Sequence, residues 1–207
     1  MMRITETVKQ LIIINIIFFV ASYFVGNAAY DYLALHMPTD DRFQFWQPLT
    51  HMFMHGGWMH IFFNMFALYS FGVVLEQVWG AKKFLFFYIS CGLGAALLHL
   101  GVNYLQMYTL LQGAADLNLS KETLHEILNV SFTTGNMFHE AIVPILEKAD
   151  KLSLLNQQSY DSLIQAAIIN QTPAVGASGA IYGVLVAFAF MLPNAELMLM
   201  FIPVPIK

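Results

Sequence analysis

Three polar residues stand inside apolar stretches of the sequence, and their types and spacing could support acyl transfer. His60 and Asn64 are four residues apart, so a helix would place them on one face. Ser178 lies near the start of a later stretch, where a helix N-terminus offers backbone N–H groups and partial positive charge. A hydroxyl nucleophile with two side-chain donors at the same depth would form an oxyanion hole. Polar packing between helices is the alternative, and these residues alone support both readings about equally.

The residues around Ser178 have unusually small side chains. Ser178 lies between Gly176 and Gly179, and Tyr182 follows one helical turn later on the same face. A stripe of small residues would let a neighbouring helix come close; its members are Gly176, Ala180, Gly183 and Ala187. On its own this motif is typical of helix packing, and the polar pair in the earlier stretch is what makes a catalytic site a competing interpretation.

The composition indicates the environment in which these residues act. Of 207 residues, 58% are apolar and 11% are charged, where soluble domains average about 45–50% and about 25%. Such hydrophobicity excludes a disordered chain, and a net charge of −4 argues against a nucleic-acid-binding protein. Too little charge remains to cover a water-facing surface, and the single cysteine, Cys91, excludes an internal disulfide. The sequence therefore predicts an all-α integral membrane protein.

Four stretches without Asp, Glu, Lys or Arg are long enough to cross a bilayer core of about 30 Å as helices. We expect these four transmembrane helices at about residues 11–29, 57–75, 84–105 and 174–192, in one membrane domain covering 1–207. The first stretch could instead be a signal peptide, but its apolar run continues past Val20, which is long for a signal core.

The distribution of basic residues predicts the orientation, because Lys and Arg collect in cytoplasmic loops. The loop of residues 30–56 carries only Arg42. The basic residues at the other ends of the stretches are Arg3, Lys9, Lys82, Lys83 and Lys207. We therefore expect a cytoplasmic N-terminus, a site that opens outward, and a multi-pass protein of a bacterial inner membrane.

Residues 106–173 are too long for a simple loop and have the apolar spacing of short amphipathic helices. One of these helices would begin after Ser120, a residue type that caps helix N-termini. We expect an extracytoplasmic helical insertion that is either a passive spacer or a gate. The proline-containing tail, residues 193–207, is expected to form an interfacial loop.

Two strings of the sequence match a known family. The run from His51 to Asn64, HMFMHGGWMHIFFN, is followed by GASGAIYG from Gly176 to Gly183, and the pair resembles the rhomboid intramembrane serine proteases. The resemblance covers most of the chain outside residues 106–173. It implies a helical bundle of rhomboid type that cleaves the transmembrane helices of other proteins.

The resemblance also implies a role for each matched residue. Ser178 would be the nucleophile, and its backbone N–H with the side chains of His60 and Asn64 would bind the oxyanion. The supporting residues would be Gly176, Gly179, His51, His55 and Tyr182, of which the tyrosine would pack against the catalytic histidine. Two further matches are Glu76, an acidic residue at the cytoplasmic end of the second span, and Trp46, which Gln47 follows where the family often has Arg.

One departure concerns the general base, which the family carries as a histidine on a span after the serine. The 207 residues contain no such span, so we expect a fragment that is inactive alone, because an unassisted serine hydroxyl stays protonated. His99 in the third stretch could substitute, although a histidine bonded within the bundle is the favoured interpretation of that residue.

Two other functions stay open. A non-catalytic rhomboid-like protein that binds membrane proteins would explain the missing base. A metal site could use His51, His55 and His60, but no carboxylate neighbours them, and we expect neither a metal nor a cofactor. The expected partners are membrane lipid and transmembrane-helix substrates, without nucleic acid, and the oligomeric state is not indicated.

Overall fold

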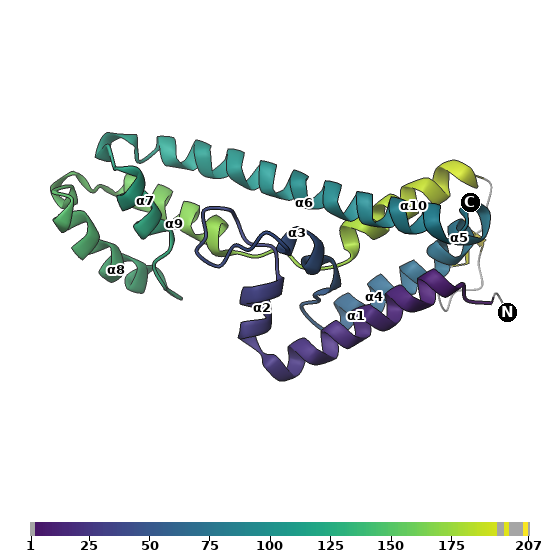
Figure 1. Cartoon of the computed structure of the whole chain (residues 1–207). Helices are drawn as coiled ribbons and strands as arrows, with labels where there is room; N and C mark the ends of the chain where they lie inside the picture. Colours follow the sequence, from purple (N-terminus) through teal and green to yellow (C-terminus); the bar gives the residue numbers. More distant parts are fainter. Residues whose placement is uncertain (1–2, 194–196, 199–204, 207) are drawn as a thin grey trace.

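The computed structural model describes residues 3–193, 197–198 and 205–206, and the regular secondary structure of this part of the chain is almost entirely helical (Figure 1). The α-helices are α1 (Glu6–Val25), α2 (Asn27–Leu33), α3 (Gln47–Thr50), α4 (Trp58–Ala67), α5 (Val73–Trp79), α6 (Ala81–Gln112), α7 (Lys121–Leu128), α8 (Gly135–Lys148), α9 (Gln157–Gln171) and α10 (Ser178–Met191). Short 3-10 turns are η1 (His51–Phe53), η3 (Ala115–Leu117) and η4 (Leu152–Leu154), and η2 (Leu68–Gly72) is a π-helical turn. In the tail, β1 (Leu197–Met198) pairs antiparallel with β2 (Pro205–Ile206); the rest of the expected interfacial loop from residue 194 lies outside the described residues.

Three of the expected membrane-crossing stretches are helices of sufficient length and apolar character, namely Glu6–Val25, Trp58–Trp79 and Ala81–Gln112. The first ends earlier than predicted, because Gly26 has a φ of +71° and the chain starts α2 in a new direction. The third continues to Gln112 rather than Leu105, so α6 runs from the bundle into the insertion (Figure 1).

The fourth stretch becomes helical later than predicted. Ala174 pairs with Leu35 through two backbone hydrogen bonds of 2.9 Å, so the chain is extended there. Gly176 then turns the chain at a φ of +120°. The sequence placed the start of this helix at about residue 174, one turn before Ser178, and this is wrong, because Ser178 is the first residue of α10, a 14-residue apolar helix.

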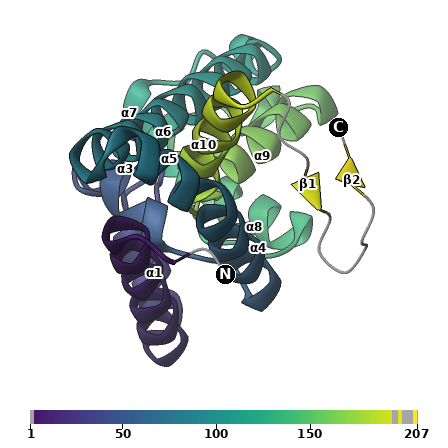
Figure 2. The same cartoon turned by 90° about the vertical axis from the view of Figure 1, so that its right-hand side faces the viewer.

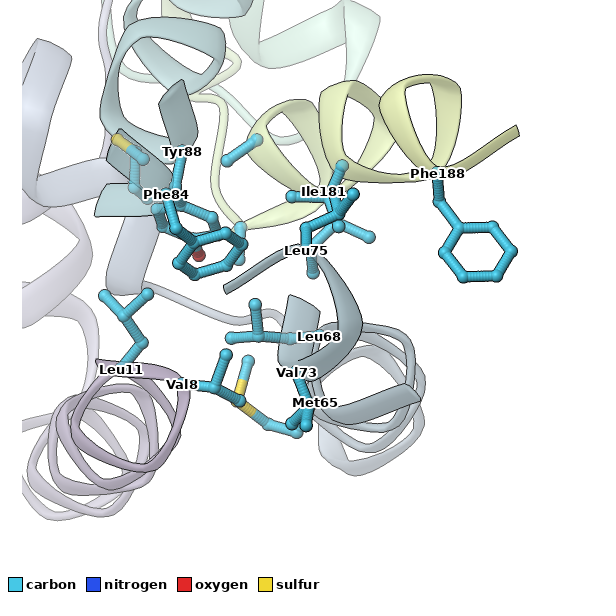
Figure 3. Packing of buried hydrophobic residues seen from close by; sticks show 14 of the residues in the cluster. Val8, Leu11, Met65, Leu68, Val73, Leu75, Phe84, Tyr88, Ile181 and Phe188 are labelled. Atoms are coloured by element: carbon cyan, nitrogen blue, oxygen red, sulfur yellow. The ribbon is translucent and has the colours of Figure 1, made fainter. Parts of the chain in front are cut away.

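The membrane-embedded core lies between α1, the α4–η2–α5 helix, α6 and α10 (Figure 3). Its fully buried side chains include Val8, Leu68, Leu75, Phe84 and Tyr88. Glu76 joins two of these helices, since its carboxylate accepts the backbone N–H groups of Thr7 and Val8 at the start of α1. In lipid, close packing and such polar contacts hold helices together, because apolar surface gains little by leaving one apolar medium for another.

Two glycines allow α10 to lie directly on α6 (Figure 2). A Cβ atom at Gly179 would lie 2.4 Å from the Cβ of Ala95, and one at Gly183 would lie 2.4 Å from the Sγ of Cys91. The predicted stripe of small residues is thus partly wrong. Gly179 and Gly183 face α6, whereas Gly176 precedes the helix and faces α4.

The insertion is helical, as predicted, and lies at the end of α6 opposite the N-terminus (Figure 1). Ser120 caps α7 by accepting the N–H of Thr123, as its residue type indicated. The insertion has a core of its own, built from α7, α8, α9 and the outer part of α6, and closed by Met37 of the loop before α3. Its fully buried members include Leu117, Ile127, Phe138, Ile142, Leu146, Leu163 and Ala167.

Candidate active site

Gly176 brings the two halves of the candidate site together. A Cβ atom at this position would lie 2.7 Å from Nε2 of His60 and 3.7 Å from Nδ2 of Asn64. The backbone that leads into α10 therefore lies against the face of α4 that carries both side chains. With a φ of +120° and no room for a Cβ atom, position 176 requires glycine. Ser178 follows two residues later, half-buried at the start of α10.

The ring of His60 directs one nitrogen toward Gly176. The backbone N–H of Gly56 donates to its Nδ1 at 3.4 Å. A ring nitrogen that accepts a hydrogen bond carries no proton, so the proton of the neutral ring is on Nε2. Nε2 is the atom nearest to the Cβ position of Gly176. His60 is therefore oriented as a donor toward the backbone before Ser178.

Asn64 supplies a second donor that the described protein leaves unused. Its amide nitrogen is buried and has no hydrogen-bond partner among the described residues. Leaving such a donor unpaired costs about 1–3 kcal/mol, and native proteins keep few of these groups without a reason. The same nitrogen is one of the three atoms nearest to the Cβ position of Gly176, beside Nε2 and Cε1 of His60. The side-chain nitrogens of His60 and Asn64 thus both lie against the backbone at Gly176.

The start of α10 adds backbone donors. Within the described chain no side chain caps this helix at Ala177. The N–H groups of a first helical turn have no partner inside the helix and carry partial positive charge. The Ser178 hydroxyl is therefore placed where a negative charge that develops on a neighbouring atom is stabilised.

His51 and His55 shape the site through their backbone and stay neutral. The carbonyl of His51 accepts the N–H of Gly176 at 2.8 Å, and its ring Nδ1 donates to the carbonyl of Gln47 at 3.0 Å. The carbonyl of His55 accepts the Tyr30 hydroxyl at 2.8 Å, and its ring packs edge-on against His60. Burial lowers the pKa of His51 and, with the nearby His60, lowers the pKa of His55 to about 4.

Two other expected participants are not among the atoms nearest to the Cβ position of Gly176. Tyr182 is one turn after Ser178, and 69% of its surface is exposed. The ring of His99 accepts the side-chain amide of Asn103 at 3.0 Å, one turn along its own helix. Among the described residues no group of three His, Cys, Asp or Glu side chains could hold a metal ion, so the three histidines near the start of α4 do not form such a group.

Gln47 has a structural role that sequence reasoning missed. Its side chain is fully buried and donates to the carbonyls of Asp31 and Arg42 at 3.2 and 2.8 Å. Its amide oxygen accepts the N–H of His36 at 3.2 Å. The preceding Trp46 donates to the carbonyl of Tyr32 at 2.9 Å. The departure from the family's Trp-Arg pair was the available signal, because nothing else in the local sequence marks this glutamine as buried.

These features define a helical membrane protein with a serine at a helix N-terminus and two donors on a neighbouring helix. The family model of the Rhomboid domain matches residues 42–117 and 153–207, which is more than half of the chain. The chain therefore belongs to the rhomboid family. The two matched segments include the residues of the candidate site, and the unmatched residues between them contain α7 and α8.

Two curated relatives are similar to parts of the chain. Rhomboid protease GluP of Bacillus subtilis is 36% identical over 50 residues, which are 24% of this chain and 10% of that protein. The mitochondrial Rhomboid protein 1 of Saccharomyces cerevisiae is 24% identical over 153 residues, which are 74% of this chain and 27% of that protein. The similarity thus covers no more than about a quarter of either relative's length.

Proposed function

We propose that the protein is a serine endopeptidase that cleaves the transmembrane helices of other membrane proteins. One observation carries the proposal. The N–H of His60 and the unpaired amide of Asn64 both face the glycine backbone that delivers Ser178 to the start of α10. Membership of the rhomboid family and the likeness to a relative named as a protease support the same chemistry.

In the proposed reaction, Oγ of Ser178 attacks the scissile carbonyl carbon while its proton passes to a general base. The carbonyl oxygen becomes an oxyanion, and the backbone N–H of Ser178, Nε2–H of His60 and the Asn64 amide stabilise its charge. The C–N bond then breaks as the base returns the proton to the leaving amine. Water hydrolyses the resulting acyl-enzyme.

The general base is not assigned to a residue of this chain. Each described histidine ring contacts a group other than Ser178; these rings belong to His36, His51, His55, His60, His99, His125 and His139. We propose that a histidine on a further span serves as the base, as the family resemblance implies. The 207 residues alone are then expected to be inactive.

The proposed setting is a bacterial inner membrane, with the N-terminus in the cytoplasm and the site open to the outer side. A substrate helix has its backbone groups bonded internally, so it must unwind before a carbonyl can reach Ser178. We therefore propose substrates that carry small or helix-breaking residues near the cleaved bond.

The test uses the full-length gene product, reconstituted in lipid vesicles and treated with a fluorophosphonate that labels active serines. We expect labelling and cleavage of a transmembrane reporter, and we expect Ser178→Ala to abolish both. The matched control is Ser90→Ala, since Ser90 is an exposed serine on α6. If wild-type protein binds the reporter but neither cleaves it nor reacts with the probe, it is a non-catalytic membrane-protein-binding member of the family.

A further inference from the structure

The loop between α2 and α3, residues 34–46, is called the outer loop here. Side chains of the outer loop and of the end of α9 form hydrogen bonds that join the two segments. Asn170 is fully buried in the last turn of α9. Its amide oxygen accepts the hydroxyl of Thr39, and its amide nitrogen donates to the carbonyl of Leu128 at 3.2 Å. One side chain therefore joins three segments, namely the outer loop, the end of α7 and the end of α9.

Arg42 makes a second connection between the same segments. It donates to the carbonyl of Gln171 at 3.0 Å, and two bonds of 2.9 and 2.6 Å to the carboxylate of Asp40 hold its guanidinium in place. Burial raises the pKa of Asp40, but hydrogen bonds from His36 and Arg42 outweigh it and keep the pKa well below its usual range. The Asp40–Arg42 pair thus stays charged at neutral pH.

The end of α7 completes the connection. The side-chain amide of Asn129 donates to the carbonyl of Thr39 at 3.0 Å, and its oxygen accepts the N–H of Asp41 at 3.1 Å. The side chain of Gln171 donates to the carbonyls of Leu128 and Val130 at 2.7 and 3.0 Å. We name the five residues that make these bonds the outer latch; they are Thr39, Arg42, Asn129, Asn170 and Gln171.

The outer latch holds the chain immediately before the nucleophile. Helix α9 ends at Gln171, and α10 begins at Ser178. Between them, Ala174 pairs with Leu35 of the latched loop, and Gly176 donates its N–H to the carbonyl of His51. Because Pro173 has no N–H and Gly176 has an unusual φ, this connection depends on its neighbours for its path. The latch bonds lie a few residues from the point where Ser178 must be placed.

We propose that the insertion is a positioning device for Ser178, which acts through the outer latch by fixing the backbone of residues 172–177. Leu128 and Asn129 belong to the part of the chain that the family model leaves unmatched, so the insertion itself supplies partners to the latch. Under this proposal the insertion is neither the passive spacer nor the gate that the sequence left open. The structural half of the inference stands by itself, and its catalytic half rests on the proposed function.

The first experiment follows amide hydrogen exchange of residues 172–178 in the full-length protein reconstituted in lipid nanodiscs. Thr39→Val keeps the side-chain shape and removes only the hydroxyl, whereas Thr39→Ser keeps the hydroxyl. We expect Thr39→Val and Asn170→Ala to raise the exchange rates of Ala174 and Gly176 at least tenfold. Thr39→Ser should restore the wild-type rates.

Tyr160→Phe is the matched control. It removes a hydrogen bond of 2.6 Å from Tyr160 to the carbonyl of Gly135, within the insertion and outside the latch. We expect it to leave exchange at Ala174 unchanged. Wild-type exchange in Thr39→Val, or equal effects of Thr39→Val and Tyr160→Phe, would overturn the proposal.

The second experiment measures catalysis by the same variants. Misplacing a nucleophile slows the chemical step, so we expect Thr39→Val to lower kcat for reporter cleavage at least tenfold and to leave KM within twofold. Thr39→Ser should recover kcat. An unchanged kcat, despite faster exchange at Ala174, would remove the catalytic half of the inference. If wild-type protein cleaves nothing, the proposed function fails, and the exchange rates still decide the structural half.

Discussion

The amide nitrogen of Asn64, which has no partner among the described residues, is the residue-scale feature that favours the proposed catalytic site over polar packing. Polar contacts that stabilise a helical bundle have partners, as the ring of His99 has Asn103. Asn64 is buried, and its donor has no partner among the described residues, although His60 lies one turn away on the same face. A donor kept unpaired in the ground state is available to a charge that forms during a reaction.

Replacing Asn64 should therefore separate activity from stability. We expect Asn64→Leu to lower kcat about 10²–10³-fold, as loss of one oxyanion donor does, and to leave the melting temperature equal or higher. Asn103→Leu is the control, because it removes a made bond to His99 and should lower stability more than kcat. The measurements are reporter cleavage and thermal unfolding in detergent. An unchanged kcat in Asn64→Leu would contradict this role.

His55 should make stability depend on pH. Its pKa falls from 6.5 to about 4 in the folded protein, so the unfolded state binds more protons between these values. Stability is therefore fully present above pH 6.5 and is lost as the pH falls toward 4, by up to roughly 3 kcal/mol. We expect a lower melting temperature at pH 5 than at pH 7.5 and a smaller difference in His55→Asn. Equal differences in both proteins would show that other groups are responsible.

At the residue scale the sequence indicates candidate residues but not their contacts. Ser178, His60 and Asn64 could be selected as candidates because polar groups are rare inside apolar stretches. The approach of Gly176 to His60 could not, because it depends on the antiparallel pair between Leu35 and Ala174, which are far apart in the chain.

At the scale of elements, two glycines determine how the serine-bearing helix meets its neighbour. Gly179 and Gly183 bring α10 onto Ala95 and Cys91 of α6. The sequence predicted close packing, but it included Gly176 in the packing stripe because it extended the helix back to residue 174. Apolar content alone does not show where an extended segment gives way to a helix, since tertiary pairing decides this point.

Enlarging Gly183 should push these two helices apart. In Gly183→Ile the new Cβ would lie 2.4 Å from Sγ of Cys91. Such overpacking typically lowers stability by about 2 kcal/mol. We expect a lower melting temperature, with partial rescue by Cys91→Gly because that change returns the missing space. Ala189→Ile is the control, since Ala189 is exposed on the same helix. Equal losses in Gly183→Ile and the control would show that the contact with α6 is not the cause.

At the scale of the whole molecule, α6 links two hydrophobic cores with different surroundings. One core lies among the apolar helices, and the other lies inside the insertion. At about 1.5 Å per residue, the 32 residues of α6 span roughly 48 Å, which exceeds a bilayer core of about 30 Å. The outer part of α6 therefore can hold the insertion clear of the hydrocarbon, on the side where Ser178 begins its helix.

The basic residues predict which side of the membrane this is. Lys82 and Lys83 lie at the other end of α6, and basic residues collect on the cytoplasmic side. The insertion and the opening of the proposed site should therefore face away from the cytoplasm. In a background of Cys91→Ser, we expect a membrane-impermeant maleimide to label Glu122→Cys on α7 in intact cells. Lys82→Cys should react only after the membrane is opened. Labelling of Lys82→Cys in intact cells, with protection of Glu122→Cys, would reverse the orientation and would place the opening of the proposed site on the cytoplasmic side.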